Sequence, residues 1–188
     1  VGTLMDQMES AEVVRENKTN MTSEEQVKAI LNTTRELDQK KAVIYEQLMG
    51  ELEPKGIRLI NFNKLSADEG KLLETYFDHE IAPYLSANIV SKQQPFPFLK
   101  NKDIYAVALL ETKDGKSKTA IIPCSNNVFK RLIDIPTRKG TFMLSEELIL
   151  HFFPKMFKNY EVKEKSLIRV TRNADIDTET IYDEDLDY

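Results

Sequence analysis

The stretch DIYAVALLETKDGKSKTAIIPCS, residues 103–125, decides the fold because it holds two apolar runs joined by a short polar turn. The runs, 103–112 and 118–125, are rich in the β-branched, aromatic and aliphatic residues that form strands. Between them lies KDGK, and an Asp-Gly pair readily adopts the backbone conformations of a tight hairpin turn. The sequence therefore predicts an antiparallel β-hairpin here.

Shorter segments on both sides of the hairpin extend the predicted sheet. Strand-like runs are IRLINF, KRLIDI, TFML and LIRVTR, at residues 57–62, 130–135, 141–144 and 167–172. One predicted helix follows Ser66, which has capping-box spacing to Glu69, and another begins where Ser145 can cap SEELILHFFPKMF. Pro154 predicts a kink or an early end of this second helix. Such a mixture favours an α+β fold with a mixed, largely antiparallel sheet.

A long amphipathic helix is predicted before this region. Thr22 and Glu25 have the spacing of a capping box, and the chain then runs without Gly or Pro until Gly50 and Pro54. Apolar residues recur on one face: Val27, Ile30, Leu31, Leu37, Ile44, Leu48 and Leu52. A helix of this length needs partners along such a stripe. We expect residues 1–16 to form part of a helical hairpin with it, and helices from outside this chain, or from a second copy, to cover the rest.

Composition bounds the class of protein. A chain of 188 residues that is 41% hydrophobic and 30% charged suits one medium domain, or a small domain with a helical appendage. The single cysteine, Cys124, excludes an internal disulfide framework and a four-cysteine zinc site. No apolar run approaches the ~20 residues of a membrane-spanning helix, and the first residues lack a signal-peptide pattern. We expect a cytoplasmic protein, with peripheral membrane association as the alternative, and the start at VGTLMDQMES suggests a piece of a longer protein.

The net charge of −5 is unevenly distributed. Residues 1–94 carry −5, residues 95–173 carry 15 Lys/Arg against 8 Asp/Glu, a net +7, and residues 174–188 carry 7 acids and no base. The basic segment could attract a polyanion, whereas the acidic one is typical of a solvated linker. A charged surface without any polyanion partner explains the same numbers, so both interpretations stay open.

Patterns of catalytic residues are mostly absent from the sequence. The glycines form neither a GxxxxGK nor a GxGxxG phosphate loop. His79 and His151 lie in amphipathic helix patterns and are interpreted as surface or half-buried histidines, and Cys124 has no evident His partner in the sequence. Three acids alternate near the C-terminus without the glycine and distal glutamate of a calcium loop: Asp175, Asp177 and Glu179. We predict no catalytic residue and no metal site in this chain.

A proline-rich segment precedes the hairpin. In QPFPFLKNK, residues 94–102, two prolines hold the backbone extended, and Phe96, Phe98 and Leu99 are expected to anchor it. The segment then presents three polar residues just before the strand: Lys100, Asn101 and Lys102. Without further information, this is a rigid loop with a solvated basic tip.

The last predicted strand also ends on polar residues. In LIRVTRNADI, residues 167–176, alternation places Arg169 on the face of Leu167 and Arg172 on the face of Ile168. The two arginines are either solvated charges at a strand end or groups directed at an anion.

The chain resembles the bacterial polyphosphate kinase family in four features that follow in order. They are the long capped helix, GIRLINFNKLSADEGKLLETYFDHEIAPYL, QPFPFLKNKDIYAVAL and SLIRVTRNADID. PFPFLKNK and RVTRNAD are the most specific of these motifs, and the resemblance covers essentially the whole chain. It implies that residues 1–55 end an N-terminal helical-bundle domain, that 56–173 form an α+β head (middle) domain, and that 174–188 are an acidic linker toward a catalytic C-terminal region outside this chain.

The resemblance also implies an activity for the parent protein. Members of this family reversibly transfer the terminal phosphate of ATP to inorganic polyphosphate through a phosphorylated histidine, with Mg²⁺ assisting. The catalytic histidines belong to the C-terminal domains, and neither His79 nor His151 matches them. For this part of the enzyme, the resemblance implies no bound cofactor and a role in forming a dimer through the head domain.

The polar segments gain a candidate role from the resemblance. A threaded polyphosphate is a dense linear anion that arginine, lysine and amide donors can hold. The candidates are Arg169, Arg172, Asn173, Lys100, Asn101 and Lys102. Arg172 could instead pair with an acid at a domain or subunit interface. The alternative function is a non-catalytic module that binds nucleic acid or another polyanion, although the chain lacks RNP-like, zinc-finger and helix-turn-helix signatures and no nucleic-acid partner is expected.

Overall fold

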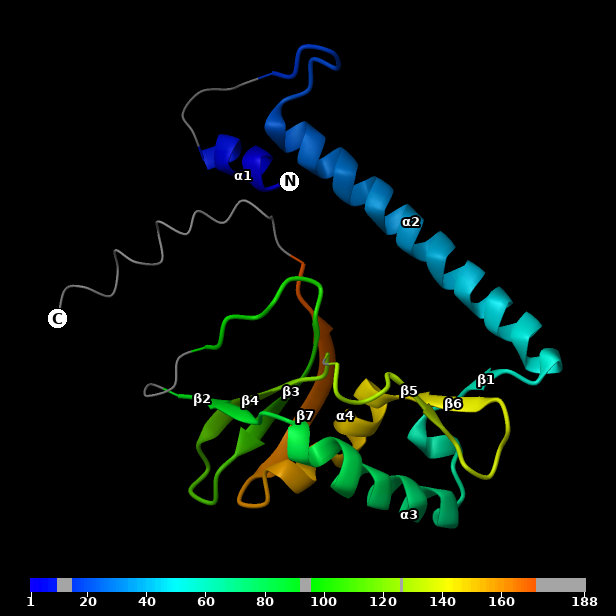
Figure 1. The fold of residues 1–188 in the computed structure, drawn as a ribbon. Helices are drawn as coiled ribbons and strands as arrows, with labels where there is room; N and C mark the ends of the chain where they lie inside the picture. Colours follow the sequence, from blue (N-terminus) through cyan, green and yellow to red (C-terminus); the bar gives the residue numbers. More distant parts are fainter. Residues whose placement is uncertain (10–14, 92–95, 126, 172–188) are drawn as a thin grey trace. The chain divides into compact units, whose positions relative to one another are not determined.

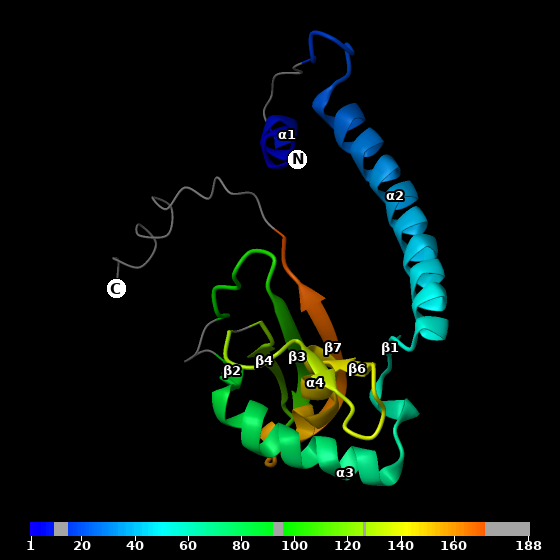
Figure 2. The ribbon, with the colours of Figure 1, turned by 45° about the vertical axis from the view of Figure 1, so that its right-hand side comes forward.

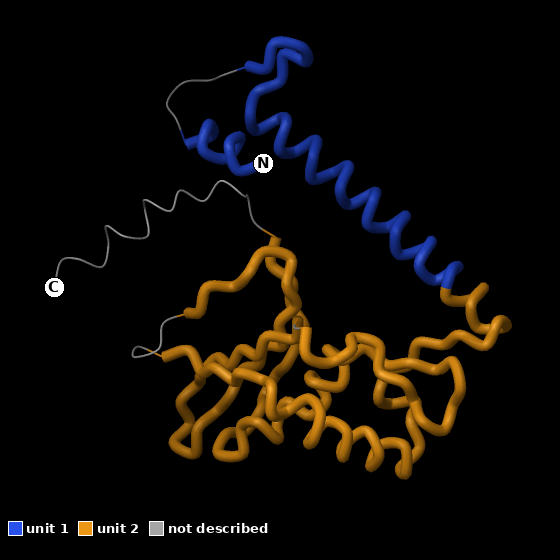
Figure 3. Tube along the Cα trace, viewed as in Figure 1, with its two compact units in different colours: residues 1–48, 172–188 blue, residues 49–171 orange. Residues whose placement is uncertain are grey.

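The computed structural model describes residues 1–9, 15–91, 96–125 and 127–171. The described residues form two compact units, Val1–Leu48 and Met49–Thr171, drawn in blue and orange in Figure 3. The first unit is helical, and the second combines two β-sheets with helices.

Two helices begin the chain, α1 (Gly2–Glu9) and α2 (Ser23–Leu52). The predicted capping box is present at the start of α2: Thr22 N–H donates to Glu25 Oε2 at 2.8 Å, and Glu25 N–H donates to Thr22 Oγ1 at 3.2 Å. Ser23 Oγ donates to Gln7 Oε1 at 2.9 Å and so ties α1 to the first turn of α2. Of the residues 1–16 predicted to pair with the long helix, Gly2–Glu9 are thus helical and bonded to its start, and residues 10–14 lie outside the described residues.

Most of the apolar stripe of α2 is exposed. Of the residues of α2, Ser23 and Val27 are buried. Five stripe residues are among the exposed large hydrophobics: Ile30, Leu31, Leu37, Ile44 and Leu48. Burying one such side chain contributes roughly 1.5–3 kcal/mol. Coverage of this stripe by helices from outside the chain, or by a second copy, remains a prediction.

The hairpin predicted from residues 103–125 lies at the centre of the second unit. It consists of β3 (Ile104–Glu111) and β4 (Ser117–Pro123), which pair antiparallel. Thr112 N–H donates to Lys116 O at 2.9 Å across the turn. Gly115 has a φ of +78°, which glycine adopts without a steric penalty, so the Asp-Gly pair closes the hairpin as predicted.

Two more strands complete an antiparallel sheet of order β2-β4-β3-β7. They are β2 (Asn88–Val90) and β7 (Glu161–Arg169). β7 begins earlier than the predicted strand at 167–172, and its register with β3 places Arg169 opposite Ile104. β2 was not predicted because its polar flanks hide a very short strand.

Both faces of this sheet bury side chains, since residues alternate along each strand. One face joins the main core through Ala106, Ala108, Leu110, Ala120 and Ile122. The other face holds a smaller cluster of Leu99, Tyr105 and Ile121, against which Val90, Val107, Ile168 and Val170 pack. β3 therefore buries side chains on both faces, although Leu109 on the second face is 40% exposed.

The second sheet has the order β1-β6-β5. Its strands are β1 (Arg58–Leu59), β5 (Leu132–Asp134) and β6 (Thr141–Leu144). β1 pairs with β6 in parallel, and β5 pairs with β6 antiparallel. The α+β class with a mixed, largely antiparallel sheet is thus confirmed.

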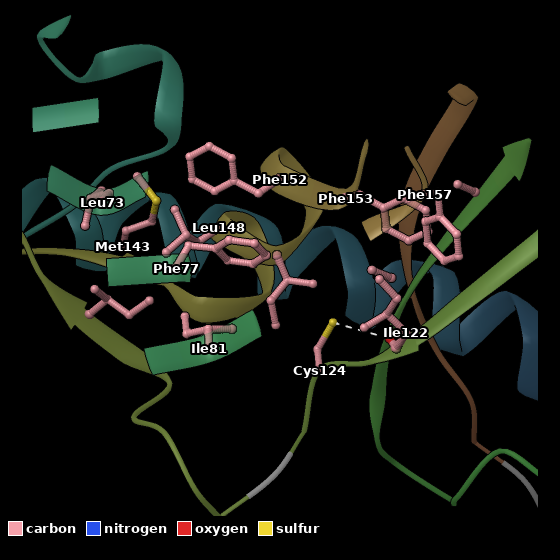
Figure 4. Packing of buried hydrophobic residues seen from close by; sticks show 14 of the residues in the cluster. Leu73, Phe77, Ile81, Ile122, Cys124, Met143, Leu148, Phe152, Phe153 and Phe157 are labelled. Atoms are coloured by element: carbon pink, nitrogen blue, oxygen red, sulfur yellow. Dashed lines mark hydrogen bonds between the residues drawn. The ribbon is translucent and has the colours of Figure 1, made fainter. Parts of the chain in front are cut away.

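Helices fill the space beside the two sheets. They are α3 (Ala67–Tyr76), which continues into the π-helical turn η3 (Phe77–Ile81), and α4 (Ser145–Met156); 3₁₀ turns are η1 (Glu53–Lys55), η2 (Phe62–Lys64) and η4 (Ala82–Tyr84). α4 packs against β3 and β7 of one sheet and β6 of the other (Figures 1 and 2). Figure 4 shows Phe77, Leu148 and Phe153, all fully buried, in this shared core. Pro154 lies inside the last turn of α4, which continues for two residues to Met156, so the proline does not end the helix early.

Two local predictions are wrong. Ser145 does not cap α4: Leu144 is the N-cap, and Ser145 N–H donates to Arg131 O at 2.8 Å, which continues the ladder between β5 and β6. The backbone of Ser145 is thus used by the sheet.

Phe96 and Phe98 are not buried anchors of the proline-rich segment, because these residues are 59% and 68% exposed. Residues two apart in an extended chain point to the same side, so these two face outward together while Leu99 turns into the core.

Glu69 joins α3 to the turn between β5 and β6. Its carboxylate completes a capping box with Ser66, whose N–H donates to Glu69 Oε2 at 2.8 Å. Arg138 donates through Nε to Oε1 at 2.7 Å and through Nη2 to Oε2 at 2.6 Å, and the Thr137 hydroxyl donates to Oε1. The donors, Thr137 first and then Arg138 and Ser66, lower the pKa of Glu69 to about 2.

We expect acid to weaken the second unit through Glu69. Because the folded-state pKa of about 2 lies below the ordinary value of 4.5, the carboxylate contributes fully above pH 4.5 and its contribution is lost as the pH falls toward 2. The free energy of unfolding, measured by urea titration, should fall over this range more in the wild type than in Glu69→Gln. Glu164→Gln, at an exposed position on β7, should behave like the wild type. Parallel pH profiles for wild type and Glu69→Gln would contradict this role.

Candidate functional site

The basic tip predicted from QPFPFLKNK forms a turn just before β3. Leu99, on its inner side, is buried, whereas Lys100 and Lys102 are exposed. Lys100 N–H donates to the hydroxyl of the buried Tyr105 at 2.7 Å. Asp103 N–H donates to Lys100 O at 3.4 Å. The buried leucine and these bonds fix the turn to the end of the sheet.

Lys102 occupies an unusual backbone conformation with a φ of +68°. A residue with a Cβ atom is strained there by about 1–2 kcal/mol. Lys102 N–H donates to Val170 O at 2.7 Å, so the chain leaving β7 holds this conformation in place.

Arg169 is brought to the same turn. It is the last residue of β7, and its Nε donates to Lys102 O at 3.2 Å across a sequence separation of 67 residues. We call Lys100, Asn101, Lys102 and Arg169 the basic corner. Among the residues that the structure describes, Lys100, Lys102 and Arg169 form no ion pair with a carboxylate. The other two candidates, Arg172 and Asn173, lie outside the described residues.

A cavity of about 410 Å³ adjoins the basic corner at Lys100. Arg131 and Glu146 also line it, and Arg131 donates to Glu146 Oε1 through Nε at 2.9 Å and Nη2 at 2.6 Å. The Glu146 side chain is only 5% exposed. Two cations, Lys100 and Arg131, and two acids, Asp103 and Glu146, line the cavity, so it offers hydrogen-bonding groups but little net charge. Lys102 and Arg169 do not line it. The unbalanced positive charge is therefore that of Lys102 and Arg169 in the basic corner.

Sequence reasoning missed the pair of Arg131 and Glu146. The two residues lie on different elements, one before β5 and one in α4, and no spacing rule connects them. The buried position of Glu146 in the first turn of a helix is visible only once α4 is packed against the sheets.

The histidines lie in packing or surface positions. The His151 ring stacks on Phe62 with centroids 3.4 Å apart and an angle of 11° between the rings. Burial, and then the charge of Lys165, lower the pKa of His151 and favour the neutral ring. His79 is exposed on η3.

The thiol of Cys124 is expected to be unreactive. Burial raises its pKa to about 12, and Sγ–H donates to Ile122 O at 3.7 Å (Figure 4). A thiol that stays protonated at neutral pH is a poor nucleophile.

The described residues offer binding groups rather than reacting groups. In the described ranges there is no group of three or more His, Cys, Asp or Glu that could hold a metal ion. Nor does any helix in this part of the chain combine the length and apolarity needed to cross a bilayer. What the basic corner can do is hold an anion through exposed cations at a fixed sheet end.

Comparison with known proteins connects this chain to one enzyme. A family model described as the polyphosphate kinase middle domain matches residues 68–187. The polyphosphate kinase of Halalkalibacterium halodurans is 34% identical over 181 residues, which cover 94% of this chain and 26% of that relative. The polyphosphate kinase of Mycobacterium tuberculosis is 29% identical over 181 residues, which cover 88% and 24%. The chain thus spans about a quarter of the length of these curated relatives.

A solved structure shares the fold. The crystal structure of polyphosphate kinase from Porphyromonas gingivalis superimposes with a TM-score of 0.64 and 22% identity, over 75% of this chain and 24% of that chain. At this level of identity the likeness concerns the fold alone.

Replacing Lys102 by asparagine removes the side-chain charge while keeping a residue that suits the backbone conformation. Asparagine tolerates a positive φ better than lysine, so Lys102→Asn should change the free energy of unfolding by less than about 1 kcal/mol, or raise it. Lys102→Val, which is β-branched, should lower it by about 1–3 kcal/mol. Chemical denaturation measures both values. Equal destabilisation by the two variants would mean that the positive φ of residue 102 does not determine how a substitution there changes the free energy of unfolding.

Proposed function

This chain belongs to the polyphosphate kinase family, and we propose that its parent enzyme reversibly transfers the terminal phosphate of ATP to inorganic polyphosphate. In this proposal the transfer proceeds through a phosphorylated histidine with Mg²⁺, and both lie outside this chain. Residues 1–55 end a helical N-terminal domain, 56–173 form the head domain, and 174–188 lead to the catalytic region. The head domain contributes a contact for polyphosphate and a surface for forming a dimer.

The observation that carries the polyphosphate contact is the basic corner. Lys100 and Lys102 lie beside Arg169 because β3 and β7 pair in one register, and none of the three has a carboxylate partner in the described part of the chain. A polyphosphate chain is a row of anionic oxygens, so it gains from cations fixed close together. The guanidinium of Arg169 also presents donors in a planar fork.

The strain at Lys102 supports the same proposal. The backbone there would favour glycine or asparagine, yet the position holds a lysine whose side chain is exposed. Strained backbone conformations cluster at functional sites, so a lysine kept at this position supports a role for its side chain in binding.

A role in binding rather than catalysis is consistent with the chemistry of the described residues. Phosphoryl transfer needs a nucleophile, a metal and convergent cations around the transferred group. The His151 ring is stacked on Phe62, and burial keeps the Cys124 thiol protonated, so neither group is prepared to act as a nucleophile.

We predict that the purified chain alone does not make polyphosphate from ATP. The expected result is no Mg²⁺-dependent product above a heat-inactivated control, while the full-length enzyme assayed in parallel is active. Polyphosphate formation by the chain, free of contaminating enzyme, would overturn the binding-only role.

In the full-length enzyme, Arg169→Ala should shorten the polyphosphate product more than it changes the KM for ATP. Loss of one exposed charge-assisted contact should weaken polyphosphate binding about two- to tenfold, and the difference should shrink at high salt. Arg169→Lys should restore part of the effect, since lysine keeps the charge but loses the fork. Lys158→Ala, at an exposed position beyond the opposite end of β7, is the matched control.

Arg172 offers a second test of the same proposal. If it lies on the polyphosphate path with Asn173, Arg172→Ala should also shorten the product at an unchanged oligomeric state. A variant that dissociates into monomers while its product length is unchanged would place Arg172 at an interface instead.

A further inference from the structure

Among the described residues, β5 has one edge without a neighbouring strand, and this edge lies in a groove of the second unit. The order β1-β6-β5 makes β5 the outer strand of its sheet among the described residues. The groove beside it has a volume of about 430 Å³. Its other wall is helical and presents Leu72, Tyr76, Glu80 and Tyr84. A free strand edge next to exposed apolar side chains is a surface that proteins usually cover.

The backbone of β5 can accept another strand. Ile135 N–H donates to Thr141 O at 2.9 Å, and Ser145 N–H donates to Arg131 O at 2.8 Å, so the odd-numbered residues bond to β6. In an antiparallel pair the bonding residues alternate. The N–H and C=O groups of Leu132 and Asp134 therefore point to the outer edge.

The side chains along this edge carry a simple charge pattern. Lys130, Leu132 and Asp134 follow one another at every second position, and all three line the groove. Leu132 is 50% exposed, and Lys130 and Asp134 are also exposed. The edge thus presents a cation, an apolar group and an anion in a row.

This pattern is complementary to itself when the strand is turned around. In an antiparallel pair centred on Leu132, the two copies of Leu132 face each other, and Lys130 of each copy faces Asp134 of the other. We propose that two copies of this chain associate here, β5 against β5, across a two-fold axis at Leu132. This inference rests on the self-association proposed for the head domain, and it specifies which strand forms the interface and which residues face each other.

The charges favour this arrangement over the alternatives. Parallel pairing would place Lys130 against Lys130 and Asp134 against Asp134, and like charges directly opposite are destabilising. A shift by two residues would separate the leucines and lose both ion pairs. Because β5 is short, the proposal also needs apolar area from Leu72 and Tyr84, which are exposed in the groove wall. An isologous interface of this kind closes after two copies.

Charge reversal tests the register. Sedimentation equilibrium of the wild-type chain should show a dimer. Lys130→Glu and Asp134→Lys, each alone, place like charges opposite each other twice per dimer and should raise the dissociation constant at least about tenfold. The double variant Lys130→Glu/Asp134→Lys restores opposite charges and should return the constant to within about threefold of the wild type. Lys158→Glu is the control at an exposed position outside the groove.

Cross-linking tests the axis. In the Leu132→Cys variant the two introduced thiols should lie opposite each other, with Cα atoms about 5.5 Å apart, which suits a disulfide. Mild oxidation should give a covalent dimer. Leu109→Cys, at an exposed position on β3, should give much less. Cys124 is buried and its thiol stays protonated, so it should not contribute.

The outcomes separate this inference from the proposals before it. A wild-type chain that stays monomeric at all concentrations would overturn both the interface and the self-association of the head domain. A dimer that ignores the charge reversals and does not cross-link at Leu132→Cys would overturn this interface alone. Circular dichroism checks that each variant is folded. Polyphosphate binding by the basic corner is tested separately, with Arg169→Ala.

Discussion

The antiparallel pairing of β3 with β7 is the interaction on which the rest of the second unit depends. β3 is hydrogen-bonded on both sides, to β4 and to β7, and it buries side chains on both faces. Its register with β7 also places Arg169 opposite Ile104 and next to the turn at Lys102. A shift of one residue would reverse which side chains of β7 face the core, and it would remove Arg169 from the turn. The same contact therefore stabilises the sheet and assembles the basic corner.

The second sheet and α3 are held together by a polar contact at the rim of the core. Glu69 is part of the capping box of α3, and its carboxylate also accepts hydrogen bonds from Thr137 and Arg138 in the turn between β5 and β6. At the end of the same turn, Gly140 has a φ of +73°, and a Cβ atom there would lie 2.0 Å from Gly56 O. Glycine is required at this position both by the backbone conformation and by the close approach of residue 56. The same turn connects β6 to β5, which is the outer strand of the sheet among the described residues and lines the groove.

The described residues divide into unreactive groups held by packing contacts and charged groups at the periphery. Cys124 and His151 are the groups most able to react, and packing holds one as a protonated thiol and the other as a neutral ring stacked on Phe62. Lys100, Lys102 and Arg169 lie at the sheet end, where water and ligands can reach them. Such a division suits a domain that holds a substrate or a partner while another part of the protein carries out the reaction, as we propose for this member of the polyphosphate kinase family.

The sequence by itself determined the elements whose signals are local. The hairpin follows from Asp114 and Gly115, and both capping boxes follow from residues three apart, so neither needed the fold to be known. Alternation and composition identified Lys100–Lys102 and Arg169 as exposed polar groups, and the family resemblance made them candidates for binding, but neither showed that they lie together. Tertiary structure alone decided the ion pair of Arg131 with Glu146, the outward turn of Phe96 and Phe98, the use of the Ser145 backbone by the β5–β6 ladder, and the free edge of β5. The physical reason is that each of these depends on which surfaces meet when segments far apart in sequence pack. A local sequence pattern determines backbone conformation and side-chain alternation, but it does not determine which distant segment packs against that element.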